Sequence, residues 1–238
     1  MIPDRALMYM PHTPKFSFPA LKTGFTTSGG RTYHVPGEHQ YESVTSFLAR
    51  VIPPSATLLE WQTRVGDAAA KAAMLRGSIR GTKVHALVEH YLMTGQDAPG
   101  DTMPIHYDMF SQARRRIDKS LQNLWLLEGT MYSHKYQLAG RNDIIGIWDG
   151  RLSVIDLKTV TTRQYPDALE KHFTQTAIYA RLFESMTGWP YEYPAISQLV
   201  IIAASETVGP DAEVFVAAAQ PYYDRFEALW QRYGRHRI

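Results

Sequence analysis

The sequence predicts a mixed α/β fold in which a central mixed sheet is flanked by helices, and three observations support this. The dipeptide Asp149-Gly150 separates two apolar runs rich in β-branched residues, which is the strongest short-range signal of a β-hairpin. The run Ile196–Ala203 is almost continuously apolar, which is typical of a strand buried on both faces. Amphipathic segments with a helical period precede and follow the hairpin. The predicted order is helix, strand, hairpin, helix and strand.

The separate elements follow from periodicity and from turn residues. Ser43 or Thr45 is expected to cap a first short helix, which Pro53-Pro54 ends. Residues 96–104 are expected to form a loop. The predicted helices span residues 44–51, 56–76, 79–93, 107–126, 166–186 and 222–235, and the predicted strands besides the hairpin span 127–137, 196–203 and 214–217.

The division into domains follows from a change in composition. The first 40 residues are rich in proline and glycine, which predicts an irregular N-terminal arm with short strands around Lys15–Phe18 and Arg31–Val35. The expected parts are the arm at residues 1–40 and a single domain at 41–238, with its core at about 77–205 and a C-terminal strand and helix at 212–237.

The composition excludes several classes of function. The chain of 238 residues is 45% hydrophobic and 20% charged, which is typical of a globular protein. It contains no cysteine, so disulfides, thiolate zinc sites, iron–sulfur clusters and cysteine nucleophiles are excluded. No apolar run approaches the roughly 18 residues that span a bilayer, and the N-terminus lacks the pattern of a secretory signal. We therefore expect a cytoplasmic protein without a membrane partner. The net charge of +2 permits a nucleic-acid partner without arguing for one.

The hairpin brings three charged side chains together. A two-residue loop sets the pairing of the two strands and places Asp143 directly opposite Asp156. Lys158 lies two residues beyond Asp156, so it points to the same face. The rest of that face is apolar, and burying two adjacent carboxylates is costly unless something neutralises them. Mg²⁺ or Mn²⁺ would do so, because both prefer oxygen ligands. The alternative is an ordinary ion pair between Asp156 and Lys158, with Asp143 in a turn.

Further polar residues occur at helical spacing. His85 and Glu89 share one face of a predicted helix, and a neutral imidazole can bind a metal. Gln175 and Tyr179 share one face of a later helix in the same way. Glu128 begins the strand before the hairpin, where it could support the metal ligands, act as a third metal carboxylate, or be a surface residue of an edge strand.

Four short stretches, in this order, resemble the PD-(D/E)xK nuclease superfamily, and within it the RecB-type exonucleases. They are GTKVH (Gly81–His85), GRND (Gly140–Asp143), IDLKT (Ile155–Thr159) and QTAIY (Gln175–Tyr179). The stretch YESVTSFL (Tyr41–Leu48) also resembles a segment of the mitochondrial genome maintenance exonuclease branch and its phage relatives. The resemblance implies a restriction-endonuclease-like αβββαβ core.

The resemblance also implies roles for individual residues. Asp143, Asp156 and Lys158 would form the catalytic set, with Lys158 orienting or activating the water. The implied metal-binding residues are His85, Asp143, Asp156 and Leu157, and the implied supporting or DNA-binding residues are Glu89, Glu128, Arg141, Thr159, Gln175 and Tyr179. Asn142 stands where the superfamily's name has proline, and Asp156 replaces the commoner glutamate. Because cysteine is absent, no iron–sulfur cluster is expected.

The expected function is a Mg²⁺- or Mn²⁺-dependent DNA exonuclease that prefers single-stranded ends, in a bacterial or phage-infected host cell. Two alternatives remain. One is an endonuclease of the same fold acting on branched or double-stranded DNA. The other is a DNA-binding or assembly protein that keeps the fold without catalysis. The sequence leaves open the polarity, the oligomeric state, the number of metal ions and the pathway, whether replication, repair, recombination or degradation of host DNA.

Overall fold

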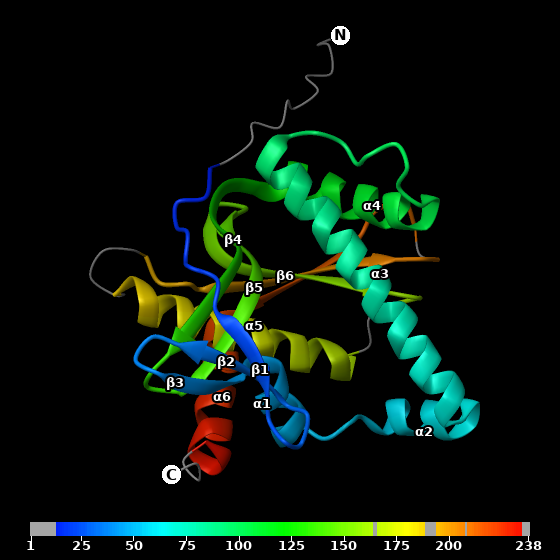
Figure 1. Ribbon diagram of the computed structural model, residues 1–238. Helices are drawn as coiled ribbons and strands as arrows, with labels where there is room; N and C mark the ends of the chain where they lie inside the picture. Colours follow the sequence, from blue (N-terminus) through cyan, green and yellow to red (C-terminus); the bar gives the residue numbers. More distant parts are fainter. Residues whose placement is uncertain (1–12, 164–165, 189–193, 208, 235–238) are drawn as a thin grey trace.

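A mixed eight-stranded sheet lies at the centre of the protein, and helices cover both of its faces (Figure 1). The computed structural model describes residues 13–163, 166–188, 194–207 and 209–234. The strands are β1 (Lys22–Phe25), β2 (Arg31–Val35), β3 (His39–Ser43), β4 (Leu121–Ser133), β5 (Leu138–Trp148), β6 (Arg151–Val160), β7 (Gln198–Ser205) and β8 (Glu213–Ala218). The helices are α1 (Val44–Val51), α2 (Ala56–Val65), α3 (Asp67–Thr94), α4 (Pro104–Ser120), α5 (Pro166–Thr187) and α6 (Ala219–Tyr233).

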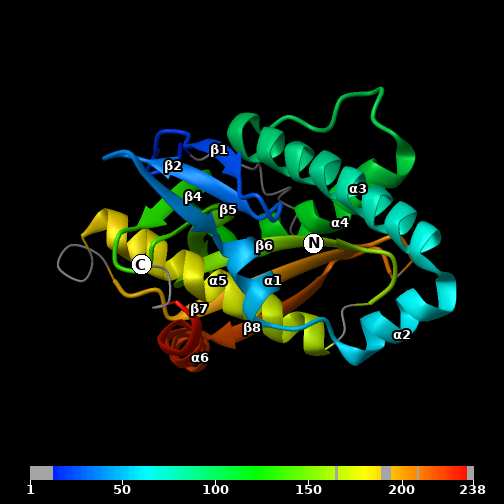
Figure 2. The same cartoon turned by 60° about the horizontal axis from the view of Figure 1, so that its bottom comes forward.

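The two faces of the sheet carry separate apolar cores. Ile145 and Val154 pack with α1, α5 and α6, whereas their chain neighbours Ile144 and Ile155 pack with α3 and α4. This division follows from the alternation of side chains along a strand. Figure 2 shows α3 and α4 on one side of the sheet and α5 and α6 on the other. The predicted sheet with helices on both faces is confirmed.

The hairpin has the predicted turn and register. Asp149 and Gly150 both adopt positive φ, at 46° and 80°, as a type I′ turn requires. Trp148 pairs with Arg151, and the ladder between β5 and β6 continues as far as Ile144 and Ile155. The next residue on each strand towards the open end of the hairpin is therefore an aspartate.

The edge of β5 beyond the ladder positions the functional site. β6 pairs with β5 only from Ile144 onwards, and β3 pairs in parallel with the start of β5, where Ser43 lies beside Ala139. Residues 140–143 lie between these two paired segments. Ser43 also caps α1, because its side chain accepts a hydrogen bond from the backbone N–H of Ser46. The pairing of β3 with β5 therefore places the start of α1 next to residues 140–143.

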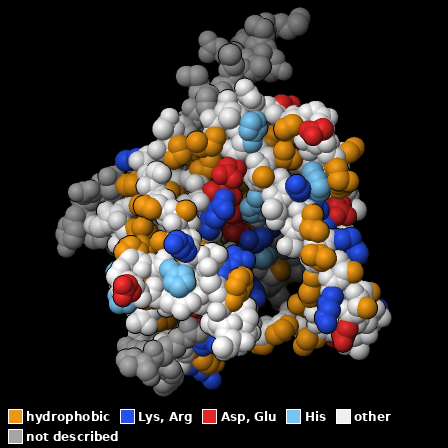
Figure 3. All heavy atoms as spheres, in the orientation of Figure 1, with side chains coloured by type: hydrophobic (Ala, Val, Ile, Leu, Met, Phe, Trp, Pro, Cys, Tyr) orange, Lys and Arg blue, Asp and Glu red, His pale blue; other side chains and the backbone are white. Residues whose placement is uncertain are grey.

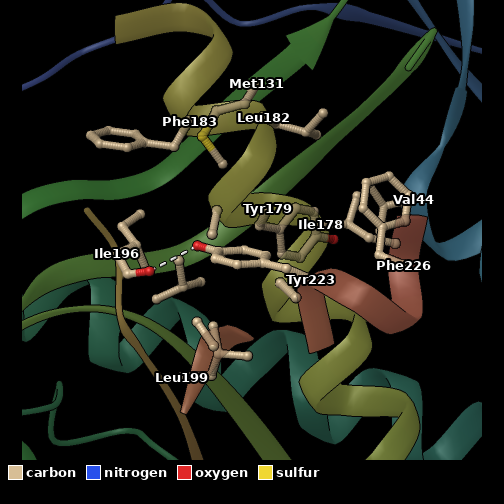
Figure 4. Close-up of a cluster of buried hydrophobic side chains, with 14 of the residues drawn as sticks. Val44, Met131, Ile178, Tyr179, Leu182, Phe183, Ile196, Leu199, Tyr223 and Phe226 are labelled. Carbon is tan, nitrogen blue, oxygen red and sulfur yellow. Dashed lines mark hydrogen bonds between the residues drawn. The ribbon is translucent and has the colours of Figure 1, made fainter. Parts of the chain in front are cut away.

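Helix α5 is anchored in the core that Figure 4 shows. Ile178, Leu182 and Phe183 are buried there, and the Tyr223 hydroxyl of α6 donates a hydrogen bond of 2.9 Å to the carbonyl of Ile196. Tyr179 lies in the same cluster and is 3% exposed. Since this helix also supplies residues to the functional site, the core fixes their positions.

The predicted break between two helices at residues 76–79 is wrong. A single helix, α3, runs from Asp67 to Thr94 and includes Gly77. A glycine inside a helix costs only about 1 kcal/mol, which the surrounding helical residues offset. The break occurs at Gly66 instead, where φ is 80°, a conformation that glycine adopts without steric cost.

The predicted helix at residues 107–126 is too long. Helix α4 ends at Ser120, and β4 begins at Leu121. Leu121 and Leu124 fit the spacing of a helix, but they pair with Trp148 and Gly146 of β5. Tertiary pairing overrides the local preference here.

Residues 22–40 of the expected N-terminal arm contribute to three strands of the sheet. The predicted strand at Arg31–Val35 is confirmed as β2. No strand forms at Lys15–Phe18, although the backbone N–H of Phe16 donates to the carbonyl of Trp125 in β4 at 2.7 Å. Residues 1–12 lie outside the described part of the chain, as does residue 235 of the last predicted helix. Within the described residues, none of the helices combines the length and hydrophobicity that a bilayer-crossing segment requires.

Candidate active site

A hollow of about 460 Å³ lies where β5 and β6 separate, between α3, α5 and the start of α1. Figure 3 shows acidic and basic side chains gathered at the centre of this face of the molecule, with histidine beside them. The hollow is lined by Arg31, Thr45, Gly81, Thr82, His85, Ala86, Glu89, Glu128, Arg141, Asp143, Asp156, Lys158, Gln175 and Tyr179. The hairpin aspartates, the helix pairs and Glu128 therefore meet in one place.

The two hairpin aspartates have different partners. Asp143 Oδ2 accepts a hydrogen bond of 2.7 Å from the backbone N–H of Leu157. Asp156 is 2% exposed, and its Oδ2 lies 2.5 Å from Lys158 Nζ. The side chain of Leu157 is buried in the core beneath α3 and α4, so only its backbone could contribute to metal binding.

Helix α3 and strand β4 add two more ligand atoms. His85 Nδ1 lies 3.3 Å from Asp143 Oδ1 and 3.8 Å from Glu128 Oε1. The ligand atoms of these three residues all lie within 4.8 Å of one another. Glu128 is therefore not a surface residue of an edge strand: its side chain is only 12% exposed and points into the cluster.

Glu128 adopts an unusual backbone conformation. Its φ is 49°, in the left-handed region that non-glycine residues rarely occupy. It lies between Leu127 and Gly129, which pair with Ile144 and Asn142 of β5. Strain of this kind costs of order 1–3 kcal/mol and persists where the surrounding structure enforces it, often at functional sites. Here it accompanies a carboxylate turned towards Asp143.

The charges of the cluster shift one another's pKa values. Burial raises the pKa of Asp156 to about 6, and the charge of Asp143 adds to this effect, although Lys158 opposes it. Burial also disfavours ionisation of Asp143, but His85, Lys158 and the N–H of Leu157 outweigh it and lower its pKa. Burial lowers the pKa of His85, but Asp143 and Glu128 outweigh it and raise the pKa to about 10. The carboxylates therefore attract a positive charge, which a proton on His85 supplies when no metal is bound.

An arginine borders this cluster. Arg141 Nε lies 2.5 Å from Glu128 Oε2, and its Nη2 lies 3.7 Å from Glu89 Oε2. Glu89 is more exposed than the other carboxylates; burial raises its pKa, and the charge of Glu128 raises it further. Arg141 thus connects Glu89 to Glu128 and fixes the second carboxylate oxygen of Glu128.

Helix α5 closes the opposite side. Gln175 Nε2 donates to the Tyr179 hydroxyl at 3.2 Å. Burial, together with the charge of Asp156, raises the pKa of Tyr179 far above its ordinary value, so the hydroxyl stays protonated. The ring of Tyr179 lies so close to Gly140 that a Cβ there would be 2.6 Å from its Cε1. Glycine at this position lets the aromatic ring approach β5.

The end of β6 is tied to α3. The guanidinium of Arg80 donates to the carbonyl of Thr159 at 3.3 Å, and it forms an ion pair with Glu206. These contacts hold α3, and with it His85, against the strand that carries Asp156. Thr159 is half-buried at this end of the strand but does not line the hollow.

Some residues of the site were not identified from the sequence. Arg31 and Thr45 line the hollow because β2, β3 and α1 are joined to β5, a pairing that the sequence did not reveal. His172 lies one helical turn before Gln175 but does not line the hollow; burial, with the charges of Lys158 and Lys171, lowers its pKa to about 3.

The donor set fits a divalent cation. Asp143, Asp156 and Glu128 offer carboxylate oxygens and His85 offers an imidazole nitrogen, a combination that suits Mg²⁺ or Mn²⁺. Burial is the main cause of the raised pKa of Asp156 and the charge of Asp143 adds to it, so this carboxylate would ionise more readily beside a further counter-charge. A cation would supply that counter-charge and would replace the proton on His85, since a ligating imidazole must be neutral.

Comparison with known protein families identifies the superfamily of the chain. The model of the PD-(D/E)XK nuclease superfamily matches residues 102–237, which is more than half of the chain. The chain therefore belongs to the PD-(D/E)XK nuclease superfamily, and its mixed sheet flanked by helices is the restriction-endonuclease-like fold of that superfamily. No curated protein matches the chain.

Two solved structures are similar to the chain at low identity. A candidate exonuclease from Eubacterium rectale is 12% identical, with a TM-score of 0.43; the match covers 66% of this chain and 64% of that one. The protein SSO0001 is also 12% identical, with a TM-score of 0.33, and the match covers 82% of this chain and 87% of that one. The assignment to the superfamily rests on the family model.

Proposed function

We propose that the protein is a Mg²⁺- or Mn²⁺-dependent deoxyribonuclease that hydrolyses phosphodiester bonds at DNA ends and prefers single-stranded ends. The observation that carries this proposal is the convergence of Asp143, Asp156 and Lys158 with His85 and Glu128 in one hollow. The membership of a nuclease superfamily supports DNA as the substrate. The preference for single-stranded ends is supported only by the resemblance of the sequence to RecB-type exonucleases.

The carboxylates and His85 would hold the metal. His85, Glu128 and Asp143, whose ligand atoms lie within 4.8 Å of one another, would bind it together with Asp156, and the backbone of Leu157 lies beside Asp143. When bound, the metal would neutralise the phosphate and make a water nucleophilic at neutral pH. The hydrogen bond from Leu157 to Asp143 would orient that carboxylate before the metal arrives.

Lys158 would act on the reacting groups. Its side chain lines the hollow and is 21% exposed, and its ammonium forms an ion pair with Asp156. From there it can donate a hydrogen bond to the attacking water or to a phosphate oxygen on which charge develops. Gln175 and Tyr179, fixed by each other and by the core, would support the site from the opposite side and contact the DNA strand.

The two alternative functions differ in their predicted products. An endonuclease of the same fold would use the same residues, because the fold does not determine where a strand is cut. A DNA-binding protein without catalysis would have no need of buried carboxylates, which cost stability unless they are neutralised. We therefore favour an enzyme.

The test is an incubation with linear single-stranded, linear duplex and circular single-stranded DNA, each with Mg²⁺, Mn²⁺ or a chelator. We expect metal-dependent shortening of linear single strands only. Cleavage of the circle would support the endonuclease instead. Retardation of DNA without cleavage under any of these conditions would support the binding protein.

A further inference from the structure

A second hollow adjoins the candidate active site. It measures about 610 Å³ and lies between the β1–β2 hairpin and helix α1, which pack side by side (Figures 1 and 2). We call it the α1 groove. Its lining includes Phe25, Ser28, Arg31, Thr45 and Ser46. Arg31 and Thr45 line both hollows, so the α1 groove begins where the candidate active site ends.

Hydrogen bonds to α1 fix the backbone of Arg31, whereas its guanidinium is available to bind a ligand. The backbone N–H of Arg31 donates a hydrogen bond of 2.8 Å to Ser46 Oγ, and the Ser46 hydroxyl donates one of 3.3 Å to the carbonyl of Arg31. Among the described residues, no acidic group forms an ion pair with the Arg31 guanidinium. The other arginine of the groove, Arg50, is held by Glu42 at 3.1 Å. Arg31 is therefore the cation that this groove presents to a ligand.

An exposed aromatic ring borders the groove. Phe25 is 70% exposed, and it pairs with Arg31 across the β1–β2 ladder. A single exposed apolar side chain is common on protein surfaces, and Phe25 matters here because it lines the same groove as Arg31. A cationic groove with an aromatic platform is the combination that binds single-stranded nucleic acid, because the cation contacts phosphate and the ring stacks on a base.

We propose that the α1 groove binds the nucleotide next to the bond that is cut, with Arg31 on its phosphate and Phe25 stacked on a base. This inference rests on the proposed nuclease function. It adds a strand-binding subsite formed by β1, β2 and α1, outside the cluster of carboxylates. The strand would run from the metal-binding hollow past Arg31 and over Phe25.

The test measures binding separately from cleavage. A short fluorescent oligothymidylate is titrated by anisotropy in Ca²⁺, with a gel run in parallel to exclude degradation. We expect Arg31→Ala to weaken binding and to reduce the slope of log Kd against log salt by about 0.7, the value for one phosphate contact on a single strand. Phe25→Leu should raise Kd at least about fivefold, whereas Phe25→Trp should keep binding close to that of the unaltered protein because it retains a stacking surface.

Lys22→Ala is the matched control, since Lys22 is an exposed cation on the same β1 strand outside both hollows. It should bind as the unaltered protein does. The proposed subsite would be contradicted if Arg31→Ala and Phe25→Leu bound as the unaltered protein does. It would also be contradicted if Lys22→Ala lost as much binding as they do. Neither result would affect the proposed nuclease function. Absence of any binding by the unaltered protein would contradict the proposed subsite as well. If the unaltered protein binds DNA through Arg31 and Phe25 but does not cut it, binding in the α1 groove is supported and the proposed nuclease function is contradicted.

Discussion

Asp143 accepts a hydrogen bond of 2.7 Å from the backbone N–H of Leu157, at the point where the ladder between β5 and β6 ends. This contact keeps the two strands together for one more residue, so that Asp143 and Asp156 stay on one face of the hairpin. The same contact helps to keep Asp143 ionised, while Asp156 in its more buried position has a pKa of about 6. Two neighbouring carboxylates thus differ in their affinity for a proton.

The first prediction concerns Asp156→Asn. The substitution removes one carboxylate oxygen from the proposed metal site but keeps the size of the side chain. We expect DNA cleavage to fall at least about 100-fold, whereas the fold and much of the DNA binding remain. Cleavage rates and anisotropy with the same oligonucleotide check this. Robust cleavage by the variant would contradict the assignment of Asp156 to the active site.

The second prediction concerns His85→Ala, with His90→Ala on the same helix as its control. His85 belongs to the cluster of ligand atoms, whereas His90 does not. We expect the affinity for Mn²⁺ to fall at least about tenfold in His85→Ala, with a smaller effect on thermal stability, and to stay unchanged in His90→Ala. Titrations with Mn²⁺ in a calorimeter measure the affinity of each variant. If both variants bind Mn²⁺ as the unaltered protein does, His85 has only a structural role.

The third prediction concerns pH in the absence of metal. The pKa of His85 is raised from 6.5 to about 10 in the folded state. The stability that its proton contributes is therefore fully present below pH 6.5 and is lost as the pH rises towards 10. In chelator, we expect Tm to decline over this range more steeply in the unaltered protein than in His85→Gln.

Metal should reduce that decline, since a ligating imidazole carries no extra proton in the complex. Melting curves at several pH values, with chelator and with Mn²⁺, provide the measurement. Parallel curves for the two proteins in chelator would show that the acidic neighbours of His85 do not raise its pKa.

The fourth prediction concerns Glu128→Gly. Glycine adopts the left-handed conformation of this position without the 1–2 kcal/mol or so that a side chain costs there, which offsets the loss of the ion pair to Arg141. We expect the metal-free Tm to stay within a few degrees, while the increase in Tm on adding Mn²⁺ shrinks. Glu128→Gln, which keeps the strained backbone, serves as the comparison. An undiminished increase in Tm in both variants would contradict a role for Glu128 in metal binding.

The fifth prediction concerns Gly140→Ala. The new Cβ would lie 2.6 Å from the ring of Tyr179, so either the ring or strand β5 must shift. Overpacking of this kind typically costs about 1–3 kcal/mol. We expect lower stability in urea denaturation, and a decrease in cleavage because Tyr179 borders the carboxylates. Tyr179→Phe, which keeps the ring, should leave the stability closer to that of the unaltered protein.

The parts of the site that could be predicted depend on short-range signals. The turn at Asp149-Gly150 determines the hairpin register, and the register places Asp143 near Asp156 without any knowledge of the remaining chain. Helical spacing likewise grouped Gln175 with Tyr179. A local rule is sufficient in both cases, because the residues concerned belong to one turn or one helix.

The parts that could not be predicted depend on pairing between distant segments. Glu128 enters the cluster through a strained backbone in β4, for which the sequence carries no signal. Arg31 lines the site because β3 pairs with the start of β5, almost 100 residues further along the chain. Residues 121–126 fit the spacing of a helix, and only their pairing with β5 makes them part of a strand.

The most direct test of the proposed function is the degradation of an end-labelled linear single strand, followed over time with Mn²⁺, Mg²⁺ or chelator. The unaltered protein and Lys158→Ala are compared side by side. We expect a ladder of shortening products that requires both the metal and Lys158. Degradation that continues in chelator, or that is as fast in Lys158→Ala as in the unaltered protein, would contradict a metal-dependent nuclease built on Asp143, Asp156 and Lys158.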